Sequence, residues 1–233
     1  MKDSAPPIST EELAYTSGGK RIRMQMWEAR GKEGVAAPAV LVLHGAGVVD
    51  AGYRYLSQLA RRLAGHGFHV FMAEYFDRTG TTSATDTTIK THAAVWLETI
   101  HDAVDFIAAQ PGVEPEGIGT LGYSLGGYLA VAHAAQDERI RAVVELAGGI
   151  DAETAAGAHR LPPLLIVHGR EDPRVSFSNA LELQGLAERL EAPVQTLFLP
   201  GERHILSPGA ALVAVRQAMR FFDAHLKSSA VMC

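Results

Sequence analysis

Residues 122–126 match the pattern GxSxG and place Ser124 between two glycines. The run before them, residues 117–121, is apolar, and residues 128–135 are rich in alanine, which predicts a strand, a sharp turn and a helix. Such a turn forces its central residue into a strained conformation that flanking glycines accommodate. It also exposes the serine hydroxyl at a helix N-terminus, where negative charge is favoured. We therefore interpret Ser124 as a nucleophile, with a structural turn residue as the alternative.

A serine nucleophile needs a base to take its proton and an acid to orient that base. Asp172 and His204 each follow an apolar run, so both are expected in loops at the C-terminal ends of strands, where open α/β sheets carry their sites. We assign Asp172 as the acid and His204 as the base. Glu171 is a weaker candidate for the acid, and Asp151 is a further alternative. Ordinary turn or surface roles for Asp172 and His204 are the non-catalytic readings.

The oxyanion of a tetrahedral intermediate needs backbone donors. One is predicted at Leu125, directly after the nucleophile, and a second in the loop at residues 44–47, where we assign Ala46 and keep Gly47 as the fallback. A glycine-rich turn without catalytic use is the alternative for this loop. The remaining histidines show no convincing zinc-ligand spacing, so we expect neither a metal nor an organic cofactor.

The elements that must position these residues follow from hydrophobic patterning. A glycine turn at residues 17–20 predicts an antiparallel hairpin at the edge of a sheet. Near-continuous apolar runs then alternate with helical periodicity, which predicts a mostly parallel, twisted sheet with helices on both faces. The predicted hairpin strands and core strands are residues 13–16, 22–27, 39–43, 68–73, 117–121, 142–147, 164–167 and 194–199. The predicted helices are residues 53–64, 91–110, 125–136, 177–190 and 209–226.

Length and composition favour one α/β domain over residues 1–233, with residues 1–12 and 227–233 expected to be flexible. Residues 148–163 lack clear periodicity and are too few for a separate lid domain, so we expect a rather open site. A net charge of −5 without blocks of like charge argues against nucleic-acid and membrane partners. The only cysteine is Cys233, and the N-terminus lacks a signal-peptide pattern, so a cytoplasmic location is the default expectation. The oligomeric state stays open, a homodimer included.

Taken together, these segments resemble the dienelactone hydrolase family of the α/β-hydrolase superfamily, whose chain order of nucleophile, acid and histidine is the one seen here. The resemblance covers roughly residues 39–226. Its specific parts are the nucleophile elbow, which is the turn at residues 122–126, the acid Asp172 and the histidine His204. The weaker parts are the strand end at residues 43–45, the segment 73–78 and the pair His168 and Gly169.

The chain also departs from that family. The family nucleophile is typically cysteine, whereas this chain has Ser124, as esterase-like relatives do. The resemblance places His44 where the family has a glutamate near the nucleophile. Of two arginines that bind the substrate carboxylate, Arg78 matches one and the other falls at Pro208. These departures argue against the dienelactone itself and leave Arg78 either as a substrate contact or in a surface ion pair.

The sequence thus predicts a serine hydrolase that cleaves small carboxylic esters or lactones through an acyl-enzyme on Ser124. Its partner would be the small-molecule substrate, and the candidate substrate contacts are His44, Glu74, Tyr75 and Arg78. Glu74 and Tyr75 follow the end of the second core strand and are candidates for the pocket wall. An exopeptidase or acyltransferase could use the same residues. A ligand-binding protein on a hydrolase scaffold is the reading from a different class.

Overall fold

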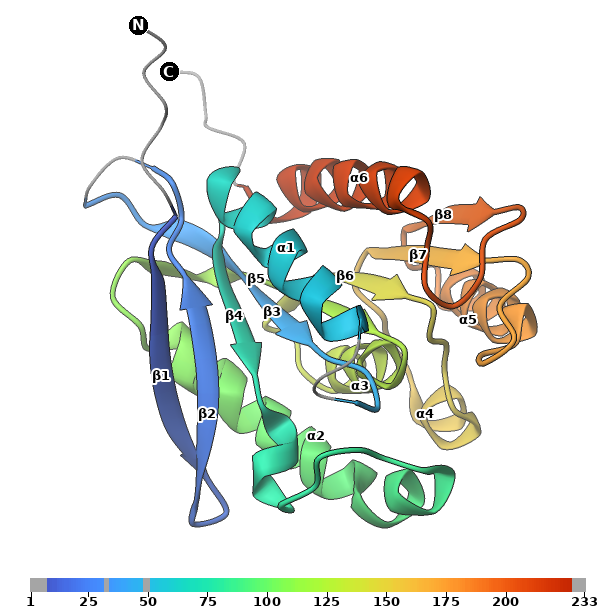
Figure 1. The fold of residues 1–233 in the computed structure, drawn as a ribbon, viewed down its shortest axis with the longest axis horizontal. Coiled ribbons are helices and arrows are strands. Elements are labelled where there is room, and N and C mark those ends of the chain that lie inside the picture. Colours follow the sequence, from blue (N-terminus) through green and yellow to red (C-terminus); the bar gives the residue numbers. More distant parts are fainter. Residues whose placement is uncertain (1–7, 32–33, 48–50, 228–233) are drawn as a thin grey trace, which may run out of the picture.

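A computed structural model describes residues 8–31, 34–47 and 51–227. All eight described strands form one sheet in the order β1-β2-β4-β3-β5-β6-β7-β8. β1 and β2 pair antiparallel, β2 joins β4 antiparallel, and every later pair is parallel. Figure 1 shows the hairpin at one edge of the sheet and β8 at the other. The predicted fold class is confirmed.

The elements alternate along the chain as the apolar runs predict. The strands are β1 (Thr10–Ser17), β2 (Lys20–Trp27), β3 (Ala37–Leu43), β4 (His69–Ala73), β5 (Val113–Tyr123), β6 (Ile140–Leu146), β7 (Leu164–Gly169) and β8 (Val194–Leu199). The helices are α1 (Ala51–Gly65), α2 (Asp86–Ala108), α3 (Leu125–Ala134), α4 (Ala152–Gly157), α5 (Phe177–Arg189) and α6 (Pro208–Leu226), with a 3-10 helix, η1 (Tyr75–Arg78).

Alternating side chains of the strands build two separate cores, one on each face of the sheet. Leu41 and Leu43 of β3 pack into the core formed with α2, α3 and α5. Val40 and Val42, from the same strand, pack into the core formed with α1 and α6. All four side chains are fully buried. Since both faces are covered, the parallel strands are apolar at almost every position.

Three segments differ from the sequence prediction. α2 begins at Asp86, five residues before the predicted start, because the Thr85 side chain caps it by accepting a hydrogen bond from the Thr88 N–H at 3.3 Å. Residues 148–163, predicted to be irregular, contain α4, which has no buried residue and therefore no apolar periodicity to detect. β1 begins at Thr10, inside the N-terminal stretch expected to be flexible. Residues 1–7 and 228–233 lie outside the described residues.

Within the described ranges, no helix combines the length and the apolar character needed to cross a bilayer.

Candidate active site

Ser124 lies at the turn between β5 and α3 in a conformation that L-residues rarely adopt, with φ 55° and ψ −120°. The two pattern glycines explain how this turn fits. A Cβ at Gly126 would collide with the backbone carbonyls of Leu43 and His44, and one at Gly122 would collide with the backbone of the new helix. The Ser124 N–H donates to the Leu146 carbonyl at 2.8 Å, which ties the turn to β6. The predicted strained turn at Ser124 is therefore present, and it is held by close packing on the end of β3 and by the hydrogen bond to β6.

Ser124, Asp172 and His204 meet at the C-terminal edge of the sheet. The Ser124 Oγ lies 3.0 Å from the His204 Nε2, and the His204 Nδ1 lies 2.7 Å from the Asp172 Oδ2. The parallel register pairs Gly169 with Leu199, so the loops that carry the acid and the histidine leave the sheet side by side. In this arrangement the Ser124 hydroxyl donates to the Nε2 while the Nδ1–H donates to the carboxylate. The geometry suits proton transfer from the serine to the imidazole.

Asp172 is fixed by more than its histidine contact. Its Oδ1 accepts hydrogen bonds from the N–H groups of Arg174 at 2.8 Å and Val175 at 3.0 Å, and the side chain is fully buried. His168 also lies beside it, with its Nε2 3.1 Å from the Val175 carbonyl and 3.4 Å from the Asp172 Oδ2. Burial lowers the pKa of His168, which favours a neutral ring there. Asp172 is thus oriented by the N–H groups of Arg174, Val175 and the His204 ring.

The loop predicted to supply an oxyanion donor is held in place by its own carbonyls. The Tyr75 hydroxyl donates to the His44 carbonyl at 2.8 Å, and the Ala84 N–H donates to the Ala46 carbonyl at 2.8 Å. Leu125 is the first residue of α3, and the first N–H groups of a helix have no acceptor within it. Ala46 and Leu125 both line the cavity that contains Ser124. Their N–H groups stay the predicted oxyanion donors.

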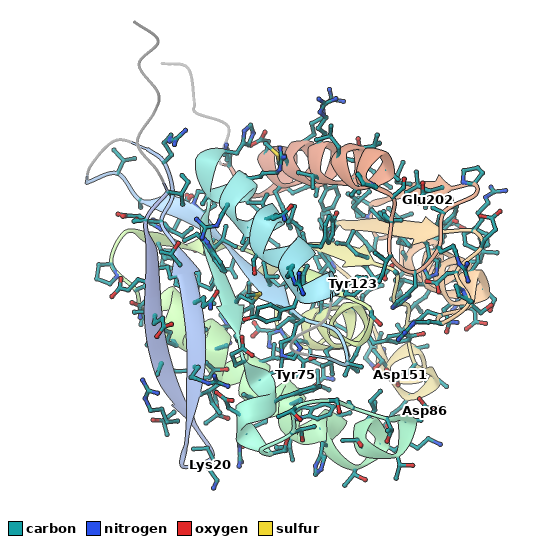
Figure 2. The ribbon with its side chains drawn as sticks, viewed as in Figure 1. Lys20, Tyr75, Asp86, Tyr123, Asp151 and Glu202 are labelled. Carbon is teal, nitrogen blue, oxygen red and sulfur yellow. The ribbon has the colours of Figure 1, made fainter. Side chains whose placement is uncertain are left out.

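That cavity has a volume of about 1050 Å³ and lies between α2, α3 and α4. Near Ser124 it is lined by Tyr128 and Asn179, whose side chains are joined by a hydrogen bond of 2.9 Å. Farther along, small and apolar side chains of α2 and α3 form its wall, and acidic and basic groups share the rim. Figure 2 labels two of the rim carboxylates, Asp86 and Asp151, at the starts of α2 and α4. Asp151 also caps α4 through the Thr154 N–H at 2.9 Å.

None of the four residues suggested as substrate contacts lines this cavity. The His44 ring is fully buried and stacks on Tyr75, with ring centroids 4.2 Å apart. Glu74 accepts a hydrogen bond from the Tyr53 hydroxyl at 2.5 Å, and burial raises the pKa of its carboxyl. Arg78 packs against the hairpin turn, and its guanidinium lies 3.6 Å from the Glu98 carboxylate. Their contacts indicate that these residues support the loop at residues 44–47 and the hairpin. Spacing in the sequence alone does not distinguish such supporting residues from residues of a pocket wall.

Sequence reasoning missed a buried carboxyl beneath the elbow. Glu145 of β6 is completely buried, accepts a hydrogen bond from the Gly148 N–H through Oε1, and has no partner for Oε2 among the described residues. Burial is the main cause that raises its pKa to about 8, and the charge of Asp172 adds to the rise. The signal was available, because Glu145 is the only charged residue in the apolar run at residues 142–147.

Glu145 should make the stability of the protein fall as pH rises. Its pKa in the folded protein, about 8, lies above the ordinary 4.5, so between these values the native state holds a proton that the unfolded state has lost. The free energy of unfolding should therefore drop by up to about 3–4 kcal/mol from pH 5 to pH 8. Glu145→Gln should remove this drop, with the melting temperature measured across that range. Glu182→Gln on the exposed side of α5 is the control, and equal pH dependence in both variants would contradict the assignment.

One group of potential metal ligands comes together in the described part of the chain, although their spacing in the sequence did not suggest it. His101 of α2, His133 of α3 and Asp137 offer ligand atoms within 4.8 Å of one another. Arg139 already donates to both carboxylate oxygens of Asp137, from Nε at 2.9 Å and from Nη2 at 2.6 Å. None of these residues lines the cavity around Ser124, so we assign them no part in its chemistry.

Known proteins resemble this chain in sequence and in fold. The profile of the dienelactone hydrolase family matches residues 28–206. Human acyl-coenzyme A thioesterase 1 is 30% identical over 166 residues, which are 67% of this chain but 37% of the thioesterase. The chain thus spans little more than a third of such relatives.

Solved structures of low sequence identity share the fold. A dienelactone hydrolase-like promiscuous phosphotriesterase from metagenomic libraries has a TM-score of 0.80 at 22% identity, covering 95% of this chain and 100% of that one. An acylaminoacyl peptidase from Pyrococcus horikoshii has a TM-score of 0.78 at 17% identity, covering 98% of this chain and 43% of the peptidase. Because the family profile spans most of the sequence and the fold agrees with it, the chain belongs to the dienelactone hydrolase family of α/β hydrolases.

Proposed function

We propose that the protein hydrolyses small carboxylic esters, thioesters and lactones through an acyl-enzyme on Ser124. The observation that carries the proposal is the continuous hydrogen-bonded path from the Ser124 Oγ through the His204 ring to Asp172, with links of 3.0 and 2.7 Å. A binding protein has no need of a hydroxyl held in a strained conformation next to an oriented base. The 30% identity to a thioesterase supports including thioesters.

The chemistry follows from the positions of the side chains. His204 removes the hydroxyl proton as Ser124 bonds to the carbonyl carbon, and the oxyanion that forms is stabilised by the N–H groups of Leu125 and Ala46. His204 then gives the proton to the leaving oxygen or sulfur as the bond to it breaks. Water then enters, and His204 takes one of its protons as the water oxygen bonds to the acyl carbon. His204 returns this proton to the Ser124 Oγ as the acyl–oxygen bond breaks, which releases the acid and restores Ser124. Asp172 stabilises the positively charged His204 ring during both acylation and deacylation.

Two departures favour esters over the dienelactone of the family. Ser124 replaces the thiol, and the two-arginine anion clamp is incomplete, because Pro208 stands at one position and Arg78 is engaged with Glu98 outside the cavity. The cavity wall formed by α2 and α3 is apolar and suits an alkyl or aryl acyl group.

The proposal is tested with matched butanoyl substrates: a p-nitrophenyl ester, a thioester and a p-nitroanilide, together with a small lactone. We expect turnover of the ester and the thioester and far slower turnover of the anilide, because an amine is the poorest leaving group of the three. Faster cleavage of the anilide would favour the exopeptidase reading instead. A folded protein that turns over none of them would support the ligand-binding reading.

A further inference from the structure

A second cavity reaches His204 from the other side of the sheet. It has a volume of about 550 Å³ and lies between α1 and α6, the two helices that cover one face in Figure 1. Tyr123, Ala147 and His204 are among the residues that line it, whereas Ser124, Leu125 and Ala46 line only the larger cavity. His204 is the catalytic side chain that both cavities share.

A substrate would reach different catalytic groups from the two cavities. The carbonyl oxygen has to reach the N–H groups of Leu125 and Ala46, which places the acyl group in the cavity between α2 and α4. The leaving atom has to reach the His204 Nε2, from which it receives a proton. The leaving group is therefore the part of the substrate that would extend past His204 into the cavity between α1 and α6.

The walls of the second cavity also indicate what it would hold. Leu59 and Val215 form part of an apolar interior, and Leu212 stays 37% exposed at its edge. Arg54 and Arg62 lie in the lining, both exposed, and neither forms an ion pair with a described residue. No described residue of this lining is acidic, whereas the larger cavity mixes acids and bases. The volume is within the range of small-molecule sites.

We propose that the α1–α6 cavity is the leaving-group subsite and that it takes an alcohol or thiol with an apolar body and an anionic end. The apolar body would pack against α1 and α6, and the anionic end would face Arg54 and Arg62. This inference rests on the proposed ester hydrolysis at Ser124 and adds the chemical class of one half of the substrate.

The charge part of the proposal is tested with butanoyl thioesters of mercaptohexanoate and mercaptohexanol, which differ only at the far end of the leaving group. Wild-type protein should prefer the carboxylate by about 3- to 10-fold in kcat/KM at low salt, because two exposed arginines contribute modestly. The preference should shrink at high salt. Arg54→Gln with Arg62→Gln should abolish this preference, so that kcat/KM for the two thioesters becomes nearly equal in the double variant. A preference that survives in this double variant would overturn the charge assignment.

The steric part is tested by filling each cavity in turn. Ala211→Phe in the α1–α6 cavity should lower kcat/KM for the mercaptohexanol thioester about tenfold relative to a methanethiol thioester of the same acid. Ala93→Phe in the larger cavity should leave that ratio unchanged and alter the ratio of octanoyl to butanoyl substrates. The reverse pattern would assign the α1–α6 cavity to the acyl group.

These outcomes separate the two proposals. Turnover with both ratios unchanged in folded Ala211→Phe would overturn the subsite and leave the proposed function intact. No turnover of any substrate by wild-type protein would overturn both.

Discussion

Replacing Ser124 by alanine is expected to lower kcat for ester hydrolysis by about 10⁴- to 10⁶-fold, because nucleophile and base act as a unit. Alanine removes only the Oγ that lies 3.0 Å from the His204 Nε2, so the cavity and the oxyanion donors remain. The activity left should be the background that binding and the oxyanion donors supply by themselves. Steady-state kinetics with a p-nitrophenyl ester checks the loss.

A glycine at the same position provides a matched control for folding. Ser124 has φ 55° and ψ −120°, a conformation that glycine adopts without steric cost, so Ser124→Gly should be at least as stable as wild type to denaturant and equally inactive. An inactive but stable variant excludes unfolding as the cause of the loss. Turnover within tenfold of wild type in either folded variant would refute the acyl-enzyme mechanism.

Asp172→Asn is expected to lower kcat by about 10³- to 10⁴-fold without unfolding the protein. The Oδ1 of Asp172 accepts from the N–H groups of Arg174 and Val175, so the asparagine oxygen should take that side and its NH₂ should face His204. An NH₂ donor requires the Nδ1 of His204 to accept, which moves the ring proton to Nε2. His204 then has no lone pair for the Ser124 hydroxyl.

The neighbouring carboxylate separates orientation from general charge. Glu171 precedes Asp172 in the chain, and its side chain is exposed, so Glu171→Gln removes one negative charge beside the site without touching the histidine contact. We expect its kcat to stay within about twofold of wild type. Equal losses in the two variants would show that the carboxylate acts only through its charge, contrary to the tautomer argument.

The sheet could be predicted because its strands are buried on both faces. Apolar runs such as residues 164–167 fall within β7, whose side chains are all buried, and the glycine turn at residues 17–20 predicted the hairpin. The three residues that meet at the sheet edge were identified in the same way, because the ends of neighbouring parallel strands come together. For these residues, the apolar pattern of each strand and the order of the strands in the sheet lead to the same prediction.

Other features depend on tertiary contacts that periodicity does not encode. α4 buries none of its residues, so no apolar pattern marks it. Arg78 and Tyr75 follow a strand end and looked like pocket residues, yet one packs on the hairpin and the other supports the His44 carbonyl. The cavity between α1 and α6 joins segments about 150 residues apart in sequence, which no single segment reveals.

The most direct test of the account is labelling with an alkyl fluorophosphonate, which bonds to an activated serine, followed by intact-mass and peptide mass spectrometry. We predict one adduct per chain on the peptide that contains Ser124, strongly slowed in His204→Ala and absent from Ser124→Ala. An ester-hydrolysing wild-type protein that takes up no label, or takes it up on another residue, would contradict the assignment of Ser124 as the nucleophile.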